Sequence, residues 1–461
     1  MSEGSLQAPI RHPIDWRSDA FYDEAAIDAE LRRVFDICHG CRRCFNLCDS
    51  FPTLFDLVDA TPGEVMEEVA SSDFAKVVDG CTLCDLCFMT KCPYVPPHEF
   101  NLDFPHLMLR YRAAEFAKGE IGVMRQALGE TDRNGKLGGL APGLVNWATD
   151  TANKPVRAVM EKIAKVDRNA ALPKFHGKTF QMRGRTAPPI NADAPGFGRK
   201  AVLYATCFVN YHNPGIGEAA RAVLAHNGVE TEIVYPACCG MPQLEEGDIG
   251  RVAERASLVA ESMAPWIESG YDVIALVPSC SLMLKFEWPL IVPGDERVIA
   301  LSAATYDISE YLVGLAKKEG LAPGLAALDG GVSLHIACHA RAQNIGQKAA
   351  ELLRLIPGID LAVTERCSGH GGSWGVMKEH FEIAIKIGKP VARAAVNQAK
   401  AYVASECPLA GEHILQGMRR IEGSSAPEVS PHPIQIFAQA YGLLAPGSVA
   451  LAPVIPQAVG G

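Results

Sequence analysis

The stretches CHGCRRCFNLC (38–48) and CTLCDLCFMTKCP (81–93) contain eight of the 15 cysteines in this chain of 461 residues. Each stretch has three cysteines spaced by two residues and then a fourth: Cys38, Cys41, Cys44 and Cys48 in the first, Cys81, Cys84, Cys87 and Cys92 in the second. A gap of two residues lets one tight turn point successive thiolates at three corners of a metal–sulfur cube. The helix that follows then carries the fourth thiolate away to a different site.

This spacing matches the ligand pattern of bacterial ferredoxins with two clusters, in which the fourth cysteine of each run binds the other cluster. It predicts two [4Fe–4S] clusters. The predicted ligands are Cys38, Cys41, Cys44 and Cys92 for one cluster and Cys81, Cys84, Cys87 and Cys48 for the other. One departure is that Pro93 follows Cys92, as the pattern expects, whereas Asp49 follows Cys48.

Two simpler roles for these cysteines are weaker. A zinc site uses four ligands from two Cys-x2-Cys pairs, so zinc would leave the additional cysteines of each run unused. Disulfides are disfavoured because nothing in the sequence indicates secretion and the spacings are too tight for a bridged framework.

The composition is that of a globular protein, with 48% hydrophobic and 21% charged residues. A net charge of -10 argues against nucleic acid as a partner. The first residues, MSEGSLQAPIRHPIDW, contain no apolar core, so we expect no signal peptide and a reducing compartment. We expect no membrane helix, because prolines interrupt the uncharged tail from 441 to 461.

From about residue 200 onward, apolar β-type runs alternate with helical patterns, which is typical of parallel α/β units. The runs are AVLYATC (201–207), TEIVYPACCG (231–240), YDVIALVPSC (271–280), VSLHIAC (332–338), LAVTERCSG (361–369) and AYVASECPLA (401–410). Three cysteines recur at offsets of 131, 129 and 127 residues: Cys207 and Cys338, Cys238 and Cys367, Cys280 and Cys407. The near-constant offset predicts a duplicated domain.

The repeated cysteines directly follow the predicted strands. Open α/β sheets bind ligands beyond the carboxyl ends of their strands, and the start of the next helix favours a thiolate. We therefore expect four cysteines of the first half to converge and to bind a further iron–sulfur cluster: Cys207, Cys238, Cys239 and Cys280. Cys238 and Cys239 are adjacent and point in different directions, so both can reach one cluster, and Gly240 allows close approach of the backbone.

The second half resembles a tandem cysteine-rich CCG domain, as found in the B subunits of heterodisulfide reductases. That family has one Cys, a Cys-Cys-Gly and a Cys-x2-Cys in each repeat. Together with the ferredoxin-type runs, the chain resembles the family of C subunits of anaerobic glycerol-3-phosphate dehydrogenases, and its layout is similar to the iron–sulfur subunits of glycolate and lactate oxidases. The resemblance covers residues 35–100 and 200–440 and implies an iron–sulfur protein with a redox partner.

Three positions depart from the CCG pattern. Met283 and Ala410 replace the last thiolate of the first and second repeat, and Ser368 replaces the second cysteine of the Cys-Cys-Gly motif. The first repeat keeps four cysteines, which is enough for one cluster. The second repeat keeps three candidate cofactor ligands, Cys338, Cys367 and Cys407, which need a fourth ligand or serve another purpose.

Two histidines, His339 and His370, adjoin the second cysteine set. Each is either a nitrogen ligand or a hydrogen-bonding residue of the crevice, and the sequence leaves both alternatives open. HGGSWG (370–375) is expected to form a tight turn around this site, with an anion cradle as the weaker alternative. No G-x-G-x-x-G motif follows a strand, so we expect no dinucleotide site and no flavin in this chain.

The expected fold class is a multidomain α+β protein, with an α-helical two-cluster ferredoxin domain followed by a duplicated α/β, parallel-sheet, cysteine-rich domain. The expected boundaries are 1–115 for the ferredoxin domain, 116–198 for a connector without chemistry, 199–325 and 326–445 for the two repeats, and 446–461 for the tail.

These features favour an electron-transfer subunit of an oxidoreductase, relaying electrons between a flavoprotein dehydrogenase and a quinone or soluble carrier. Two alternatives remain. One is a catalytic thiol/disulfide reductase like heterodisulfide reductase, which the missing thiolates disfavour, and the other is a redox-sensing iron–sulfur scaffold. We expect a cytoplasmic protein, with association at the inner face of the membrane through a partner as an option. The sequence assigns neither catalytic residues nor a substrate.

Overall fold

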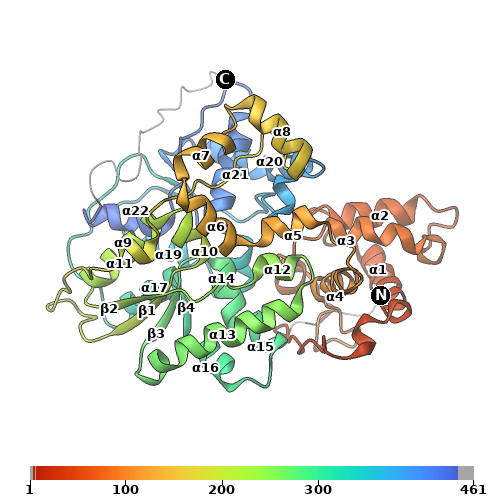
Figure 1. Ribbon diagram of the computed structural model, residues 1–461, viewed down its shortest axis with the longest axis horizontal. Coiled ribbons are helices and arrows are strands. Elements are labelled where there is room, and N and C mark those ends of the chain that lie inside the picture. Colours follow the sequence, from red (N-terminus) through yellow and green to blue (C-terminus); the bar gives the residue numbers. More distant parts are fainter. Residues whose placement is uncertain (1–3, 6, 445–461) are drawn as a thin grey trace.

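The computed structural model describes residues 4, 5 and 7–444, so the predicted tail (446–461) lies outside the described residues. A helical unit from the N-terminal part of the chain lies at one end of the molecule, and two α/β units lie at the other (Figure 1). Two parallel sheets follow the helical N-terminal region. The expected fold class is therefore confirmed.

The N-terminal unit is helical because its apolar residues recur at helical spacing and share one aromatic core. The ring of Phe35 packs against Phe74 and Phe104, with centroids 5.4 and 5.9 Å away. The helices are α1 (Glu24–Cys41), α2 (Ser50–Asp59), α3 (Phe74–Asp79) and α4 (Phe104–Lys118), with the short turns η1 (Asp19–Tyr22), η2 (Met66–Glu68), η3 (Ser71–Asp73) and η4 (Cys87–Lys91).

The first α/β unit is built on a four-stranded parallel sheet with the order β2-β1-β3-β4. Most residues of the central strands are buried, as expected for parallel strands covered on both faces. The strands are β1 (Lys200–Tyr204), β2 (Glu230–Val234), β3 (Asp272–Ala275) and β4 (Thr305–Asp307). The helices are α10 (Cys207–Tyr211), α11 (Pro214–His226), α12 (Met241–Glu245), α13 (Ile249–Glu268), α14 (Pro278–Leu282), η5 (Met283–Glu287), α15 (Trp288–Ile291), α16 (Glu296–Ala304) and α17 (Ile308–Lys318).

The second α/β unit repeats this plan with a three-stranded parallel sheet of order β6-β5-β7. Its strands are β5 (Val332–His335), β6 (Leu361–Thr364) and β7 (Tyr402–Ser405). Its helices are α18 (Cys338–Ala342), α19 (Lys348–Leu353), η6 (Trp374–Val376), α20 (Phe381–Gln398), α21 (Pro408–Arg419) and α22 (Pro433–Ala440). In this order β5, β6 and β7 take the places of β1, β2 and β3, so the structure has the duplication that the cysteine offsets predict.

In both units the chain leaves the central strand for one neighbour and returns to the other. The strand order therefore reverses beside β1 and beside β5, and such a reversal is where open α/β sheets bind ligands. The six repeated cysteines follow the strands that meet at these edges: Cys207, Cys238 and Cys280 follow β1, β2 and β3, and Cys338, Cys367 and Cys407 follow β5, β6 and β7.

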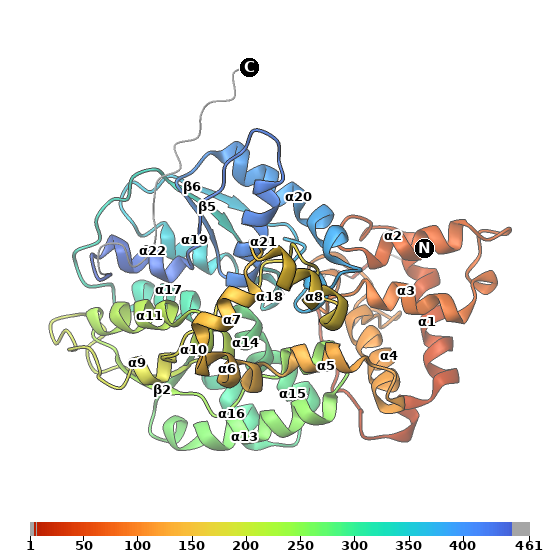
Figure 2. The ribbon, with the colours of Figure 1, turned by 45° about the horizontal axis from the view of Figure 1, so that its top comes forward.

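The connector is helical and lies against both α/β units (Figure 2). Its helices are α5 (Val123–Gly129), α6 (Thr131–Leu140), α7 (Pro142–Thr149), α8 (Lys154–Ala164) and α9 (Phe180–Arg183). Phe180 is fully buried against α11 of the first unit, and the backbone N–H of Asp167 donates to Val376 O of the second unit (2.9 Å). Among the described residues, no helix is both long enough and apolar enough to span a bilayer.

A buried network of charges joins the N-terminal unit to the first α/β unit. Arg11 forms ion pairs with three carboxylates, at 2.9 Å to Asp85, 2.8 Å to Asp103 and 2.9 Å to Glu287. Nε2 of His106 lies 3.1 Å from Glu287. Burial alone would raise the pKa of Glu287, but the charges of Arg11 and His106 lower it to about 2. The N-terminal segment therefore fastens the two units together through compensated charges.

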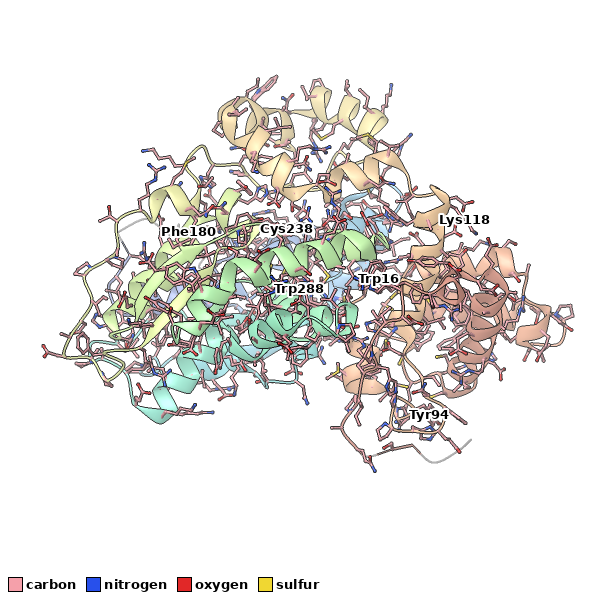
Figure 3. All side chains as sticks on the ribbon, turned by 60° about the horizontal axis from the view of Figure 1, so that its bottom comes forward. Trp16, Tyr94, Lys118, Phe180, Cys238 and Trp288 are labelled. Atoms are coloured by element: carbon pink, nitrogen blue, oxygen red, sulfur yellow. The ribbon has the colours of Figure 1, made fainter. Side chains whose placement is uncertain are left out.

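Two smaller contacts complete the attachment of the N-terminal unit. The Trp16 indole donates from Nε1 to Ile291 O of the first α/β unit (2.9 Å), and Trp16 lies beside Trp288 in the view of Figure 3. On the other side, Nε2 of His380 in the second α/β unit lies 2.6 Å from Asp79. The N-terminal unit thus contacts the first repeat through Arg11 and Trp16 and the second repeat through the ion pair of Asp79 with His380.

Candidate functional site

The first ferredoxin-type cysteine set lies where α1 ends. Cys38 and Cys41 are on its last turn, and Arg42 then adopts the left-handed conformation (φ 53°), which ends the helix and turns the chain toward Cys44. A cavity is lined by Cys38, Cys41, Cys44 and Cys92, together with apolar residues that include Phe51 and Leu102. These four cysteines are the set that the ferredoxin spacing predicts.

The second ferredoxin-type set lies on the loop between α3 and η4. Leu83 (φ 46°) and Asp85 (φ 61°) are both left-handed, so the loop reverses direction sharply between its cysteines. Burial, followed by repulsion from Cys81 and Cys84, raises the pKa of Cys48 well above its usual range. The fourth cysteine of each run therefore lies with the other run. Cys44 and Cys87 are also close enough to interact, which places the two sets next to each other.

Burial and mutual repulsion make these thiols hard to ionise without a nearby cation. Burial is the main cause that raises the pKa of Cys44 and of Cys81 to about 12. Burial, followed by repulsion from the other thiols of its set, raises the pKa of Cys38 well above its usual range. A bound metal centre would supply the positive charge that offsets both costs. The donor sets therefore fit iron–sulfur clusters.

Four cysteines converge at the carboxyl edge of the first sheet, and Cys238, labelled in Figure 3, lies among them. The sulfurs of Cys207 and Cys238 are 3.7 Å apart. The neighbouring thiols of Cys238 and Cys280 are the main causes that raise the pKa of Cys239 well above its usual range. Gly240 has a φ of 85°, a conformation that glycine adopts without strain. The structure thus brings together the four first-repeat cysteines.

Buried side chains hold the Cys-Cys-Gly segment in place. The fully buried Trp288 donates from Nε1 to the carbonyl oxygen of Cys239 (3.1 Å), and Arg255 donates to that of Cys238 (3.4 Å). Met283, which stands where the family pattern has a thiolate, is fully buried and begins the π-helical turn η5. It therefore fills the core beside the cysteines.

The connector contributes two residues to this site, although the sequence predicts no chemistry there. Oδ2 of Asp132 accepts a hydrogen bond from the Cys238 backbone N–H (2.9 Å), and Asp132 also accepts one from the Tyr235 hydroxyl. The buried hydroxyl of Thr131 lies close to Cys207 and Cys238 and has no hydrogen-bond partner among the described residues. No spacing pattern marks Thr131 and Asp132, because they precede the strand and loop pattern of the domain that they contact.

The cysteines of the second repeat do not form a matching set. Cys338, the first residue of α18, has a pKa raised by the neighbouring Cys367 and also by Cys84 from the second ferredoxin-type run. Cys407 instead has Cys280 of the first repeat as its cysteine neighbour. The three second-repeat cysteines are thus divided between two different surroundings.

The two histidines of the second repeat have different surroundings. His339 uses both ring nitrogens, since Nδ1 lies 2.8 Å from Ser279 Oγ and Nε2 lies 3.4 Å from Leu83 O. This supports the hydrogen-bonding alternative for His339. Burial, assisted by the neighbouring His413 and His339, lowers the pKa of His370 to about 3, so that ring is neutral. The segment 370–375 forms the expected tight turn.

Each cysteine set has the next one as its neighbour, so the sets form a continuous series that we call the line of cysteine sets. The first ferredoxin-type set adjoins the second through Cys44 and Cys87. The second set adjoins Cys338 through Cys84. Helix α18, which begins at Cys338, packs on α14, which carries Cys280 of the first-repeat set. Sequence order does not reveal this line, because it runs from the ferredoxin-type unit past the second repeat to the first.

The comparisons with known proteins agree with this architecture. Residues 201–285 and 332–411 match the cysteine-rich domain family CCG, which coincides with the two α/β repeats. The chain is 28% identical to the C subunit of the anaerobic glycerol-3-phosphate dehydrogenase of Escherichia coli (strain K12) over 318 residues, covering 68% of this chain and 76% of that protein.

Two further relatives belong to different systems. The chain is 24% identical over 367 residues to the B subunit of the fumarate reductase (CoM/CoB) of Methanothermobacter marburgensis, covering 75% of this chain and 69% of that protein. It is 29% identical over 187 residues to the lactate utilization protein A of Geobacillus thermodenitrificans, covering 38% of this chain and 74% of that protein. The predicted resemblance to the C subunit of anaerobic glycerol-3-phosphate dehydrogenase and to CCG-domain proteins is therefore confirmed.

Proposed function

Because the chain carries two cysteine-rich CCG domains and is similar to subunits of oxidoreductases, we propose that it is the iron–sulfur electron-transfer subunit of an oxidoreductase complex. Two [4Fe–4S] clusters are bound in the N-terminal unit, by the two cysteine sets that combine residues of both runs. A third iron–sulfur cluster is bound by Cys207, Cys238, Cys239 and Cys280. The chain's own task is to space these cofactors and tune them, since the redox chemistry belongs to the clusters.

The observation that carries this proposal is the line of cysteine sets. Each set adjoins the next through named side chains, from Cys44 and Cys87 to Cys84 and Cys338 and across the α14–α18 contact. A catalytic site for an organic substrate needs a cavity with convergent polar groups. A series of neighbouring buried and half-buried cysteines instead suits the passage of single electrons.

A flavoprotein dehydrogenase is the proposed partner, and a quinone or soluble carrier is at the other end of the relay. The connector offers a surface for such a partner, since Leu140, Leu144, Trp147 and Ile163 on α6, α7 and α8 are 58 to 81% exposed. Exposed apolar groups of this size on one region are typical of protein interfaces. We place the complex in the cytoplasm, with any contact at the inner face of the membrane made through a partner.

The test is to count clusters in the full chain after anaerobic purification. Iron and labile sulfide analysis should give about twelve irons per chain if three four-iron clusters are present. EPR of the dithionite-reduced protein should show interacting clusters from the N-terminal unit and a separate third signal. About eight irons would remove the cluster of the first repeat from the proposal, and zinc without iron would overturn it altogether.

A second experiment tests the partner. The tagged chain is purified anaerobically from its own cells and examined for a bound flavoprotein by its flavin absorbance and by mass spectrometry. A flavoprotein that transfers electrons to the chain supports the proposal. Turnover of a disulfide by the isolated chain would replace it with the thiol/disulfide reductase alternative.

A further inference from the structure

The second repeat places two thiols beside each other and beside a proposed cluster ligand. Cys338 and Cys367 each come three residues after His335 and Thr364, which are paired in the β5–β6 register. Their counterparts in the first repeat, Cys207 and Cys238, have sulfurs 3.7 Å apart. The neighbouring Cys367 and Cys84 also raise the pKa of Cys338. Cys338 begins helix α18, and Cys367 lies in the loop between β6 and η6, so the two thiols come from separate elements of one crevice. Both are half-buried.

The repeat has lost the groups that would make this pair part of a larger cluster site. Ser368 and Ala410 occupy two of the family's thiolate positions, and Cys407 lies with Cys280 instead. His339 is unavailable as a replacement ligand, because both of its ring nitrogens face hydrogen-bonding partners. Cys407 is thus separated from Cys338 and Cys367, which share their crevice with Cys48 and Cys84 of the ferredoxin-type runs.

The pair is held against the loop of the second ferredoxin-type run. Nε2 of His339, next to Cys338, lies 3.4 Å from Leu83 O, next to Cys84. On the other side of the crevice, Gly371 approaches Thr82 so closely that a methyl group on Gly371 would lie 3.0 Å from Thr82 Cγ2. The backbone N–H of Gly369 donates to the Cys367 sulfur (3.4 Å). Contacts on both sides thus keep the two thiols beside Cys84.

We propose that Cys338 and Cys367 are a redox-active pair that forms a disulfide in the oxidised protein and is reduced by electrons from the adjacent cluster site of the N-terminal unit. This inference rests on the proposed function, because that function supplies the one-electron carriers. A disulfide has an S–S bond of about 2.0 Å, and these two cysteines follow paired neighbouring strands at the positions where the first repeat holds its sulfurs 3.7 Å apart, so side-chain rotation can form the bond.

The chemical step is balanced. Reduction breaks the Cys338–Cys367 S–S bond and takes up two electrons and two protons, giving two thiols. The electrons arrive singly from the iron–sulfur carriers of the N-terminal unit, and the protons come from solvent at the half-buried residues Cys338 and Cys367. Oxidation reverses these steps. The pair therefore converts single-electron transfer into a two-electron store between the N-terminal unit and the first repeat.

The test labels thiols in the cluster-loaded full chain in two redox states. One sample is oxidised anaerobically with thionine and the other is reduced with dithionite, and both are denatured in acid, alkylated and digested for mass spectrometry. The oxidised sample should contain a Cys338–Cys367 cross-linked peptide, two hydrogens lighter than the pair of free peptides. After dithionite both cysteines should be alkylated, and an electrochemical titration of the labelled fraction should follow a two-electron slope.

Two outcomes would overturn the inference. Alkylation of both cysteines in the oxidised sample would show that no disulfide forms, and a Cys84–Cys338 cross-link would show that Cys84 is not a cluster ligand. Iron analysis of the same samples tests the proposed function separately. Iron without the disulfide would leave the electron-transfer role supported and overturn only this inference. A disulfide without iron would remove the proposed electron source.

Variants give an independent check. Cys338→Ser should leave Cys367 free to alkylate in both redox states while the iron content stays that of the wild type. Cys407→Ser is the matched control and should keep the cross-link. Loss of about four irons per chain from Cys338→Ser would identify a cluster ligand instead of a redox thiol and would overturn the inference.

Discussion

The two α/β repeats have the same strand order and the same cysteine positions, yet they place their thiols differently. In the first repeat, Cys207, Cys238 and their neighbours converge under Trp288, and the connector covers them through Asp132. In the second repeat the thiols are divided between the N-terminal unit and the first repeat. A duplicated fold therefore preserves the positions of functional side chains at strand ends, whereas the packing of neighbouring units decides what those side chains meet.

The largest expected effect is on iron content. It comes from replacing Cys239 of the first repeat by serine, the residue that the second repeat has at the equivalent position. Cys239→Ser corresponds to the natural Ser368, and it should remove the third EPR signal and about four irons per chain, leaving about eight in the N-terminal unit. Cys367→Ser is the matched change in the second repeat and should leave the iron content unchanged. Equal iron loss in both variants would show that the repeats are equivalent after all.

The N-terminal unit should also be attached more strongly to the first repeat than to the second, as measured by the free energy of unfolding. Arg11→Met leaves three carboxylates, Asp85, Asp103 and Glu287, without their main positive partner in a buried site. We expect a loss of about 3–5 kcal/mol in the free energy of unfolding, measured by urea denaturation followed by circular dichroism.

The matched change on the side of the second repeat is His380→Gln. It removes an ion pair with Asp79, whose side chain is 39% exposed, so the cost should be about 1 kcal/mol or less. A larger loss for His380→Gln than for Arg11→Met would contradict the view that the first repeat provides the stronger attachment.

A pH dependence should arise where the two repeats meet. Burial, then the charge of Glu246, raises the pKa of Glu245 to about 8, and its carboxyl lies so close to Gly372 that a methyl group on Gly372 would lie 2.5 Å from Oε2. The fold therefore favours the neutral acid. Its contribution to stability is complete below the pKa of an unfolded glutamate, about 4.3, and is lost as the pH rises through 8.

The variant Glu245→Gln isolates this contribution. The difference in unfolding free energy between wild type and variant should change by about 1–2 kcal/mol from pH 5 to pH 9, less than the full shift implies because Glu245 as a whole residue is only half-buried. Urea denaturation at several pH values measures the difference. A constant difference over this range would show that Glu245 does not titrate abnormally.

The smallest expected effect is on the reduction potential of the third cluster, and it comes from changing Asp132, the connector residue beside the first-repeat cysteines. Asp132→Asn keeps an oxygen that can accept from the Cys238 N–H but removes a negative charge near the sulfurs. The reduction potential of the third cluster should rise by tens of millivolts, because negative charge near a cluster disfavours the added electron. Redox titration followed by EPR measures it. An unchanged potential would show that the carboxylate acts only through its hydrogen bond.

The sequence by itself determined the local chemistry. Cysteine spacing in the stretches 38–48 and 81–93 predicted two crossed sets, and the structure groups those eight cysteines in that way. The alternation of strands and helices and the offset of the repeated cysteines predicted two parallel sheets with Cys238 and its partners at strand ends, which the fold confirms. These features depend on residues close together in the chain or on a repeated period, so a linear pattern contains them.

Only the tertiary structure decided which cysteine set lies next to which. The contact of Cys338 with Cys84 and the covering of Cys238 by Asp132 join residues that no motif connects. They accompany the ion pairs that fasten the N-terminal unit to both repeats, Arg11 to Glu287 of the first repeat and Asp79 to His380 of the second. The packing of whole units against one another sets the distances between these residues, because buried charges and apolar faces must each meet a partner. Residue spacing in a single sequence does not contain this information.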